Sequence, residues 1–238
     1  MIKKIIQSVN PTRRAIVFDA STLISLSMNG LIKELASLKK VFKGKFLITR
    51  EVKEEIIDNP IKIKRFELEA LRVKELFDNK ILELPDSLSI DEKIISAKTK
   101  EIIDMSNNYF SSRRGPIKLI HSGEASCLAL GKILNEKKIA YSLAVDERTL
   151  RMLVEKPENL KSLLEKKMHT HIQVNKHNFE YFKGFRIIRS TELMYVAYKK
   201  GLVSLKDGNS VLDALLYALK FKGCAISSEE IEEIKRMK

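Results

Sequence analysis

The sequence contains no apolar run that approaches the roughly 18 residues of a membrane-spanning helix, so we expect no transmembrane segment. Its start, MIKKIIQSVNPTRR, is basic, but its apolar stretch is too short for a secretory signal peptide. Tryptophan is absent, and only two cysteines occur, Cys127 and Cys224, both in apolar helical contexts. Because disulfides are rare in reducing compartments, this usage favours two buried, reduced thiols in a cytoplasmic protein.

The chain also lacks the glycine-rich motifs of nucleotide-binding α/β proteins. It has no Gly-x-Gly-x-x-Gly, and no Gly-Lys-Ser/Thr follows an apolar run that could form a strand. It contains no internal repeat and no low-complexity tract. A nucleotide-binding domain and a repeat architecture are therefore both disfavoured.

Positive charge, by contrast, is in excess. The 238 residues include 44 Lys and Arg against 31 Asp and Glu, which gives a formal net charge of +13. Hydrophobic residues make up 44%, enough for a sizeable core and too many for a disordered chain. A basic surplus of this size favours polyanionic partners, meaning RNA, DNA or an anionic membrane surface.

Short apolar runs alternate with amphipathic patterns along the chain. The apolar runs predict strands at 15–18, 46–49, 81–84, 141–145 and 186–189. The amphipathic patterns predict helices at about 31–38, 51–58, 61–79, 90–109, 123–136, 148–154, 159–168, 191–200, 210–222 and 228–237. This alternation predicts a parallel sheet with helices on both faces, within a single domain over 13–238 that carries insertions near 96–118 and 156–184.

Two of the predicted strands end on an acid. In AIVFDASTLISL the first strand ends at Asp19, and in YSLAVDERTLRML a later one ends at Asp146, with Glu147 directly after it. Ligands of an open parallel sheet bind outside the carboxyl ends of its strands, so we expect these acids at a site. Each could instead cap the helix that follows, and Glu147 could replace Asp146.

A third acid follows the second strand, in ITREVKEEIID. Thr49 is a good N-cap, and Glu55 lies nearest the side of the helix that Val52, Ile56 and Ile57 predict to be buried. Glu51 shares a face with Glu55 one turn earlier and remains the alternative. Both could also belong to a solvated acidic face near a helix N-terminus.

The fourth acid gives the sharpest signal. In HSGEASCLALG we expect Ser122 to cap a helix on which Glu124 begins a small, apolar stripe formed by Cys127, Leu128 and Gly131. A buried carboxylate is unfavourable unless it is paired or bound to a cation. The helix dipole offsets only about 0.3–1 kcal/mol of that penalty.

Two strand-end aspartates and two inward glutamates can therefore meet at one edge of the sheet. Carboxylates gathered in this way repel one another unless some are protonated or a cation binds. Their oxygen atoms suit Mg²⁺ or Mn²⁺, and water bound to such an ion can act as a nucleophile. Beside a basic surface, the expected substrate is a phosphodiester.

On these segments the sequence resembles the PIN-domain family of metal-dependent nucleases. The resemblance lies in IVFDASTLISL, ITREVKEEI, SGEASCLALG and LAVDERTLR, in that order, and it maps the family's acids to Asp19, Glu55, Glu124 and Asp146. The C-terminal stretch from RIIRSTELMYVAYKKGLV onward is similar to one prokaryotic branch, although the small Gly-Thr-Leu-Gly turn common there is Ser-Thr-Glu-Leu here. The resemblance implies a three-layer α/β/α sandwich, with a parallel five-stranded sheet in the order 3-2-1-4-5.

The resemblance also implies an activity, that of a Mg²⁺- or Mn²⁺-dependent endoribonuclease acting on single-stranded RNA. Such proteins serve as toxins paired with an antitoxin protein or as RNA-processing enzymes, so RNA, an antitoxin and a second copy in a homodimer are the expected partners. The alternative is a non-catalytic nucleic-acid-binding or adaptor protein with a PIN-like fold.

Further residues are candidates for substrate contacts. Ser21 and Thr22 could hydrogen-bond Asp19 or a bound phosphate, or could simply cap the next helix. Arg113 and Arg114 lie in a Gly/Pro segment that we expect to be a surface loop, and Arg148 follows the last acidic pair. All three arginines could contact phosphates, and all three could equally be ordinary solvated side chains.

Overall fold

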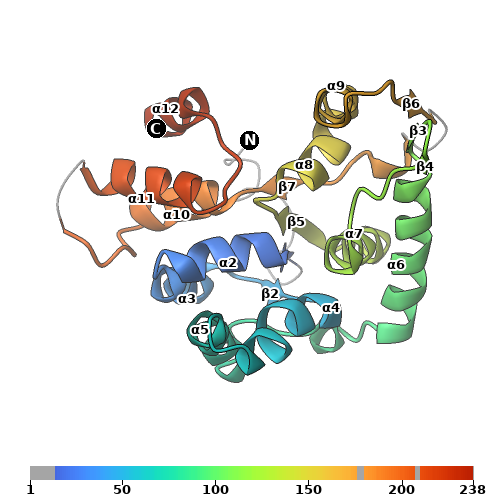
Figure 1. Ribbon diagram of the computed structural model, residues 1–238. Coiled ribbons are helices and arrows are strands. Elements are labelled where there is room, and N and C mark those ends of the chain that lie inside the picture. Colours follow the sequence, from blue (N-terminus) through green and yellow to red (C-terminus); the bar gives the residue numbers. More distant parts are fainter. Residues whose placement is uncertain (1–13, 176–179, 207–209, 238) are drawn as a thin grey trace.

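The computed structural model describes residues 14–175, 180–206 and 210–237; Arg13, the first residue of the predicted domain, lies outside them. Within these residues, four parallel strands form one sheet in the order β2-β1-β5-β7 (Figure 1). The strands are β1 (Arg14–Phe18), β2 (Lys45–Leu47), β5 (Ala140–Ala144) and β7 (Ile187–Ile188). The predicted α/β class and the parallel sheet are confirmed.

The third predicted strand, at 81–84, is present only as a single parallel bridge between Leu47 and Glu83. Glu83 N–H donates to Phe46 O at 2.9 Å and Glu83 O accepts from Ile48 N–H at 3.0 Å, so this segment lies beside β2. Pro85, which has no N–H to donate, follows two residues later and begins the 3₁₀ helix η3 (Pro85–Leu88). The sheet of the described residues is therefore four-stranded rather than five-stranded.

Helices lie on both faces of this sheet. One face carries α7 (Ser122–Glu136), which packs on β1 and β5, and beyond it α6 (Glu92–Asn107) (Figure 1). On the opposite side lie α2 (Ala20–Met28), α3 (Ile32–Val41), α10 (Ser190–Lys199) and α11 (Ser210–Phe221). Because both faces are covered, the β1 residues from Ala15 to Phe18 are almost completely buried. The arrangement is compatible with a three-layer α/β fold.

The region after β2 differs from the single helix predicted at 51–58. A short α-helix, α4 (Arg50–Lys53), continues as a π-helix, η1 (Glu54–Asp58), and then as a 3₁₀ turn, η2 (Pro60–Lys62). The next helix, α5 (Glu67–Asp78), begins six residues later than the predicted start at 61. The helical run is interrupted at Ile63, whose backbone is extended (φ −111°, ψ 111°), so the 3₁₀ turn ends there before α5 begins.

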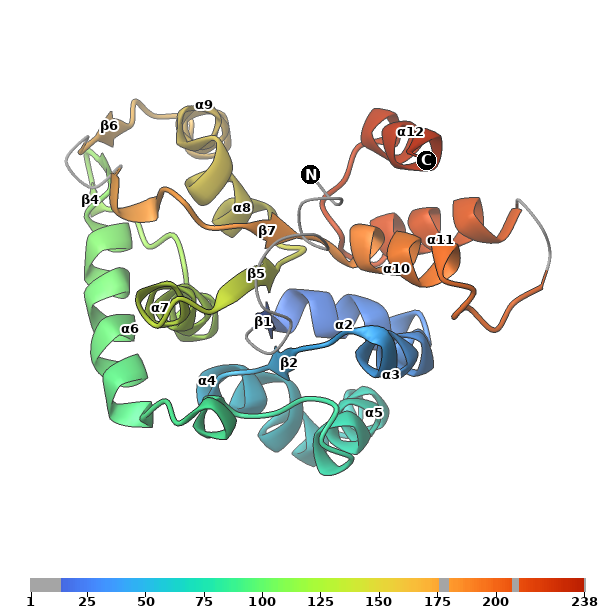
Figure 2. The same cartoon turned by 180° about the vertical axis from the view of Figure 1, so that it is seen from behind.

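The two predicted insertions meet in space. The first contains most of α6 and a hairpin of β3 (Phe110–Ser112) and β4 (Gly115–Pro116). The second contains α9 (Pro157–Met168), β6 (Gln173–Val174) and η5 (Glu180–Phe182), with residues 176–179 outside the described part. Because β6 pairs with β3, the insertions share a small antiparallel sheet in the order β4-β3-β6, on the side of the molecule away from α10 and α11 (Figure 2).

The remaining helices are α8 (Arg148–Glu155), which follows β5, and α12 (Ser228–Arg236) near the C-terminus. None of the helices that the structure describes has the length and apolar character needed to cross a membrane. Cys127 and Cys224 are both buried and form no disulfide.

Candidate active site

A pocket of about 480 Å³ opens at the carboxyl ends of β1 and β5. Four chain segments contribute to it: the start of α2, the α4–η1 segment, the start of α7 and the residue that precedes α8. Carboxylates dominate its wall, and they come from Asp19, Glu51, Glu54, Glu55, Glu124 and Glu147. The pocket therefore lies at the edge of the sheet where the sequence predicts a site.

Asp19 follows β1 directly and caps α2. Its Oδ2 accepts hydrogen bonds from Ser21 N–H at 3.0 Å and from the Ser21 hydroxyl. Its Oδ1 is buried and accepts no hydrogen bond from the described residues. Burial raises the pKa of Asp19 to about 6, although the bonds from Ser21 act in the opposite direction. Asp19 thus has one oxygen that Ser21 fixes and one that accepts no hydrogen bond of good geometry from the described part of the chain.

Glu124 lies in the first turn of α7. Its Oε2 accepts a hydrogen bond from His121 N–H at 2.6 Å, while no described residue is bonded to its other oxygen. Burial, together with the charges of Asp19, Glu147 and Glu55, raises the pKa of Glu124 to about 8. These four carboxyl groups are therefore electrostatic neighbours, and both burial and the neighbouring charges favour the protonated form of Glu124.

Ser122 is the first residue of α7 rather than its N-cap, because the helix begins one residue earlier than predicted. Thr49, by contrast, caps α4 as predicted, and its Oγ1 accepts a hydrogen bond from Val52 N–H at 3.3 Å. The same hydroxyl lies 2.6 Å from Ser126 Oγ on α7. This contact holds the α4–η1 segment, which carries Glu51 and Glu55, against the helix that carries Glu124.

Glu51 and Glu55, the two alternatives that follow the second predicted strand, both line the pocket. Glu55 Oε2 lies 2.5 Å from the point that a Cβ atom on Gly123 would occupy, so a side chain at position 123 would displace this carboxylate. Burial raises the pKa of Glu55, and the charge of His121 lowers it. Glu51 also lines the pocket, and its Oε2 is buried with no hydrogen bond from the described residues. The geometry favours neither glutamate over the other.

Asp146 and Glu147 face different surroundings. The Asp146 side chain is fully buried and does not line the pocket; its Oδ1 accepts from Ser190 N–H at 2.8 Å and its Oδ2 from Ser190 Oγ at 2.6 Å. Glu147 does line the pocket and also caps α8, accepting from Leu150 N–H at 2.7 Å. Of the two alternatives that the sequence left open, Glu147 therefore lines the pocket, whereas both carboxyl oxygens of Asp146 are bonded to Ser190 at the start of α10.

Ser21 connects the ends of the two central strands. Its hydroxyl donates to Asp19 and accepts from the N–H groups of Asp146 at 3.1 Å and Glu147 at 3.3 Å. Ser21 lines the pocket, but its polar atoms are occupied in holding Asp19 and Glu147 in place. Thr22 is fully buried and does not line the pocket, so it faces the protein interior rather than a ligand there.

The predicted arginines do not line the pocket. Arg113 and Arg114 are exposed in the turn of the β3–β4 hairpin, which Figure 1 shows at the end of α6 distant from α4. Arg148 is exposed at the first position of α8, directly after Glu147. Four polar residues of the pocket wall were not among the predicted site residues: Glu54, Asn59, His121 and Ser122. The position of His121, directly before the helix start that carries Glu124, is the signal that could have identified it.

The donor set fits a hard divalent cation. Carboxylate oxygens are the ligands that Mg²⁺ and Mn²⁺ prefer, and the buried Oδ1 of Asp19 lacks any other partner among the described residues. In the described part of the chain, no three His, Cys, Asp or Glu side chains already converge as a metal-binding group. Rotation of the glutamate side chains toward Asp19 would therefore have to complete such a site.

Comparisons with protein-family models, with curated proteins and with solved structures gave no match for this chain. The resemblance to the PIN domain accordingly rests on the sequence segments quoted above.

Proposed function

We propose that this chain is a Mg²⁺- or Mn²⁺-dependent endoribonuclease of PIN type, which hydrolyses phosphodiester bonds of single-stranded RNA in the cytoplasm. The observation that carries the proposal is the buried Asp19 Oδ1, which lacks a hydrogen bond from the described residues in a pocket lined by five further carboxylates. The six carboxyl groups of this pocket contrast with the net charge of +13 of the chain, and a bound cation would offset their mutual repulsion.

Electrostatics explain why a cation belongs to this proposal. Without one, the pocket would repel the phosphates of RNA, and its carboxyl groups already raise one another's pKa values. A bound Mg²⁺ or Mn²⁺ supplies Lewis-acid stabilisation of the charge that develops on phosphorus-bound oxygens and lowers the pKa of water. The proposed chemistry needs no nucleophilic side chain.

The proposed roles of the residues follow from their contacts. Asp19, Glu124 and Glu147 are the proposed ligands, with Glu55 or Glu51 as a fourth, since each presents carboxyl oxygen to the pocket. Ser21 and the N–H of His121 hold one oxygen each of Asp19 and Glu124, which limits the motion of those side chains.

Cleavage of labelled single-stranded RNA tests the proposal. We expect activity with Mn²⁺ or Mg²⁺, its loss on adding a chelator, and a decrease of more than about 100-fold in both Asp19→Asn and Glu124→Gln, as for the loss of a metal ligand. Glu233→Gln, an exposed acid on α12, is the matched control and should retain full activity.

Activity that survives both pocket substitutions, or that is indifferent to the chelator, would refute the proposal. Metal-independent RNA binding without any cleavage would favour the non-catalytic nucleic-acid-binding or adaptor protein. The toxin-type and RNA-processing roles share the proposed chemistry, and copurification of a small antitoxin protein would distinguish them. A homodimer is a further proposal, which solution mass measurement tests.

A further inference from the structure

A basic and aromatic loop begins directly beside the pocket. Asn59 is part of the pocket wall, and the chain passes from it through η2 into the sequence Lys-Ile-Lys-Arg-Phe at residues 62–66. All five of these side chains are exposed, and for Ile63 and Phe66 the exposed fractions are 48% and 46%. We call this segment the 62–66 loop.

Backbone hydrogen bonds fix the shape of the 62–66 loop. Ile63 N–H donates to Pro60 O at 2.9 Å, and Phe66 N–H donates to Ile63 O at 2.8 Å. At the start of the turn, Lys62 N–H donates to Asn59 O at 3.2 Å. The main chain of the loop is therefore held by backbone hydrogen bonds, while its side chains face solvent.

The loop combines cations with an aromatic ring. The Arg65 guanidinium lies 5.4 Å from the centre of the Phe66 ring, while Lys64 is paired with Glu67 at 2.9 Å. Among the described residues Lys62 has no ion-pair partner. An exposed ring flanked by cations is the combination with which proteins bind unpaired bases and the phosphates between them.

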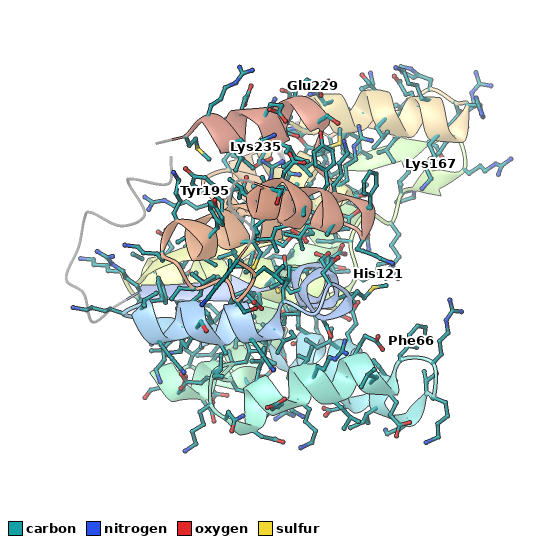
Figure 3. The ribbon with its side chains drawn as sticks, turned by 90° about the vertical axis from the view of Figure 1, so that its left-hand side faces the viewer. Phe66, His121, Lys167, Tyr195, Glu229 and Lys235 are labelled. Carbon is teal, nitrogen blue, oxygen red and sulfur yellow. The ribbon has the colours of Figure 1, made fainter. Side chains whose placement is uncertain are left out.

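The position of the loop suits a ligand that also enters the pocket. Figure 3 shows Phe66 and His121, a residue of the pocket wall, at the same edge of the molecule. The pocket itself is acidic and repels phosphate, so a polyanion needs cations nearby to hold it there. Exposed Leu68 and Leu71 on α5 could contact a protein partner, but three cations within the five loop residues favour a polyanion.

We propose that the 62–66 loop binds single-stranded RNA next to the pocket, with phosphates at Lys62 and Arg65 and one base stacked on Phe66. The identity of the ligand as RNA rests on the proposed function, whereas binding at the loop requires neither a metal nor cleavage. The inference can therefore be tested without catalysis.

The test is fluorescence anisotropy of a labelled single-stranded RNA oligonucleotide, measured with chelator present over a range of salt concentrations. In Phe66→Ala we expect binding weaker by about 5-fold or more, as for the loss of one base–ring stack. In the Lys62→Gln/Arg65→Gln double variant, the slope of log K against log salt should fall by about 1.4 in magnitude, or about 0.7 per phosphate contact.

Matched substitutions directly before β2 provide the control. Val41, which is 50% exposed, and the exposed Lys43 lie at the amino end of the sheet, opposite the edge that carries the pocket, so Val41→Ala/Lys43→Gln should bind RNA like the unmodified protein. Duplex RNA, whose bases are already stacked, should be insensitive to Phe66→Ala. All variants should unfold at the temperature of the unmodified protein.

Two results would overturn the inference. The first is an unchanged affinity and salt slope in the loop variants, and the second is an absence of RNA binding by the unmodified protein, which would leave a protein partner as the ligand of the loop. Hydrolysis of bis(p-nitrophenyl) phosphate with Mn²⁺ separates the two proposals. If the loop variants lose RNA binding but the unmodified protein hydrolyses no phosphodiester, the nuclease proposal fails and the loop inference stands.

Discussion

The two carboxyl oxygens of Asp19 differ in their hydrogen bonding. One is held by Ser21 and the other is buried without a hydrogen-bond partner among the described residues. Leaving a buried polar atom unsatisfied destabilises a fold by about 1–3 kcal/mol, so natural structures seldom keep one without a use. A cation in the pocket would satisfy this oxygen.

The raised pKa values of Asp19 and Glu124 predict how the metal-free protein responds to pH. Their pKa values rise from ordinary values of 3.8 and 4.5 to about 6 and about 8, so the folded chain binds more protons than the unfolded chain between these limits. Stability is therefore highest, as far as these groups are concerned, below about pH 4, and it falls as pH rises toward 8. A cation that binds these carboxylates should therefore stabilise the protein most at high pH, where the carboxylates have lost their protons.

We accordingly expect Mn²⁺ to raise the unfolding temperature more at pH 8 than at pH 5, as measured by calorimetry at constant ionic strength. Glu124→Gln should stabilise the metal-free protein at pH 8 by about 1–3 kcal/mol and should abolish most of the Mn²⁺ effect. Glu233→Gln should change neither. An equal Mn²⁺ effect at both pH values would contradict the assignment of the cation to these carboxylates.

At the scale of the elements, the position of each acid after its strand determines whether its side chain lines the pocket. Asp146 belongs to the link between β5 and α10: its carboxylate accepts two hydrogen bonds from Ser190, and its backbone O accepts one from Ala225 N–H at 3.1 Å. Glu147, one residue later, lines the pocket. Adjacent acids therefore have separate roles in the molecule.

This separation predicts opposite phenotypes for adjacent substitutions. Asp146→Ala should lower the free energy of unfolding by about 2–4 kcal/mol and should increase hydrogen exchange in α10, because Ser190 loses two buried acceptors. Glu147→Gln should leave stability within about 1 kcal/mol, since the amide oxygen can still cap α8, but should weaken Mn²⁺ binding about 10-fold or more. Denaturant unfolding and metal titration measure both effects. If Asp146→Ala weakened Mn²⁺ binding and Glu147→Gln instead lowered stability, Asp146 rather than Glu147 would be the metal ligand.

Sequence reasoning located the strands and the carboxyl edge because these depend on local apolar runs and on the rule for parallel sheets. It could not choose between Asp146 and Glu147, because that choice depends on Ser190, a residue distant in the chain. It also predicted that the helix now seen as α5 begins at residue 61, because the apolar pattern does not reveal that the backbone of Ile63 is extended. The predicted third strand is reduced to one bridge because Pro85 begins a 3₁₀ helix directly after it.

At the scale of the whole molecule, charge is distributed unevenly. The pocket is acidic, although the chain carries a net charge of +13, and the exposed cations of the 62–66 loop lie beside it. This distribution supports the proposed binding of RNA, in which the loop cations contact phosphates and a divalent cation neutralises the acidic pocket. The pairing of the two insertions in the β4-β3-β6 sheet was not predictable, because each strand has only two or three residues and its partner is distant in sequence.

The most direct test of the central claim is anomalous diffraction from crystals grown or soaked in Mn²⁺. We expect a peak in the pocket about 2.1–2.3 Å from Asp19 Oδ1, with Glu124 and Glu147 turned toward it and Asp146 still bonded to Ser190. A pocket without a peak at millimolar Mn²⁺, or a peak that Asp19 does not contact, would contradict the account.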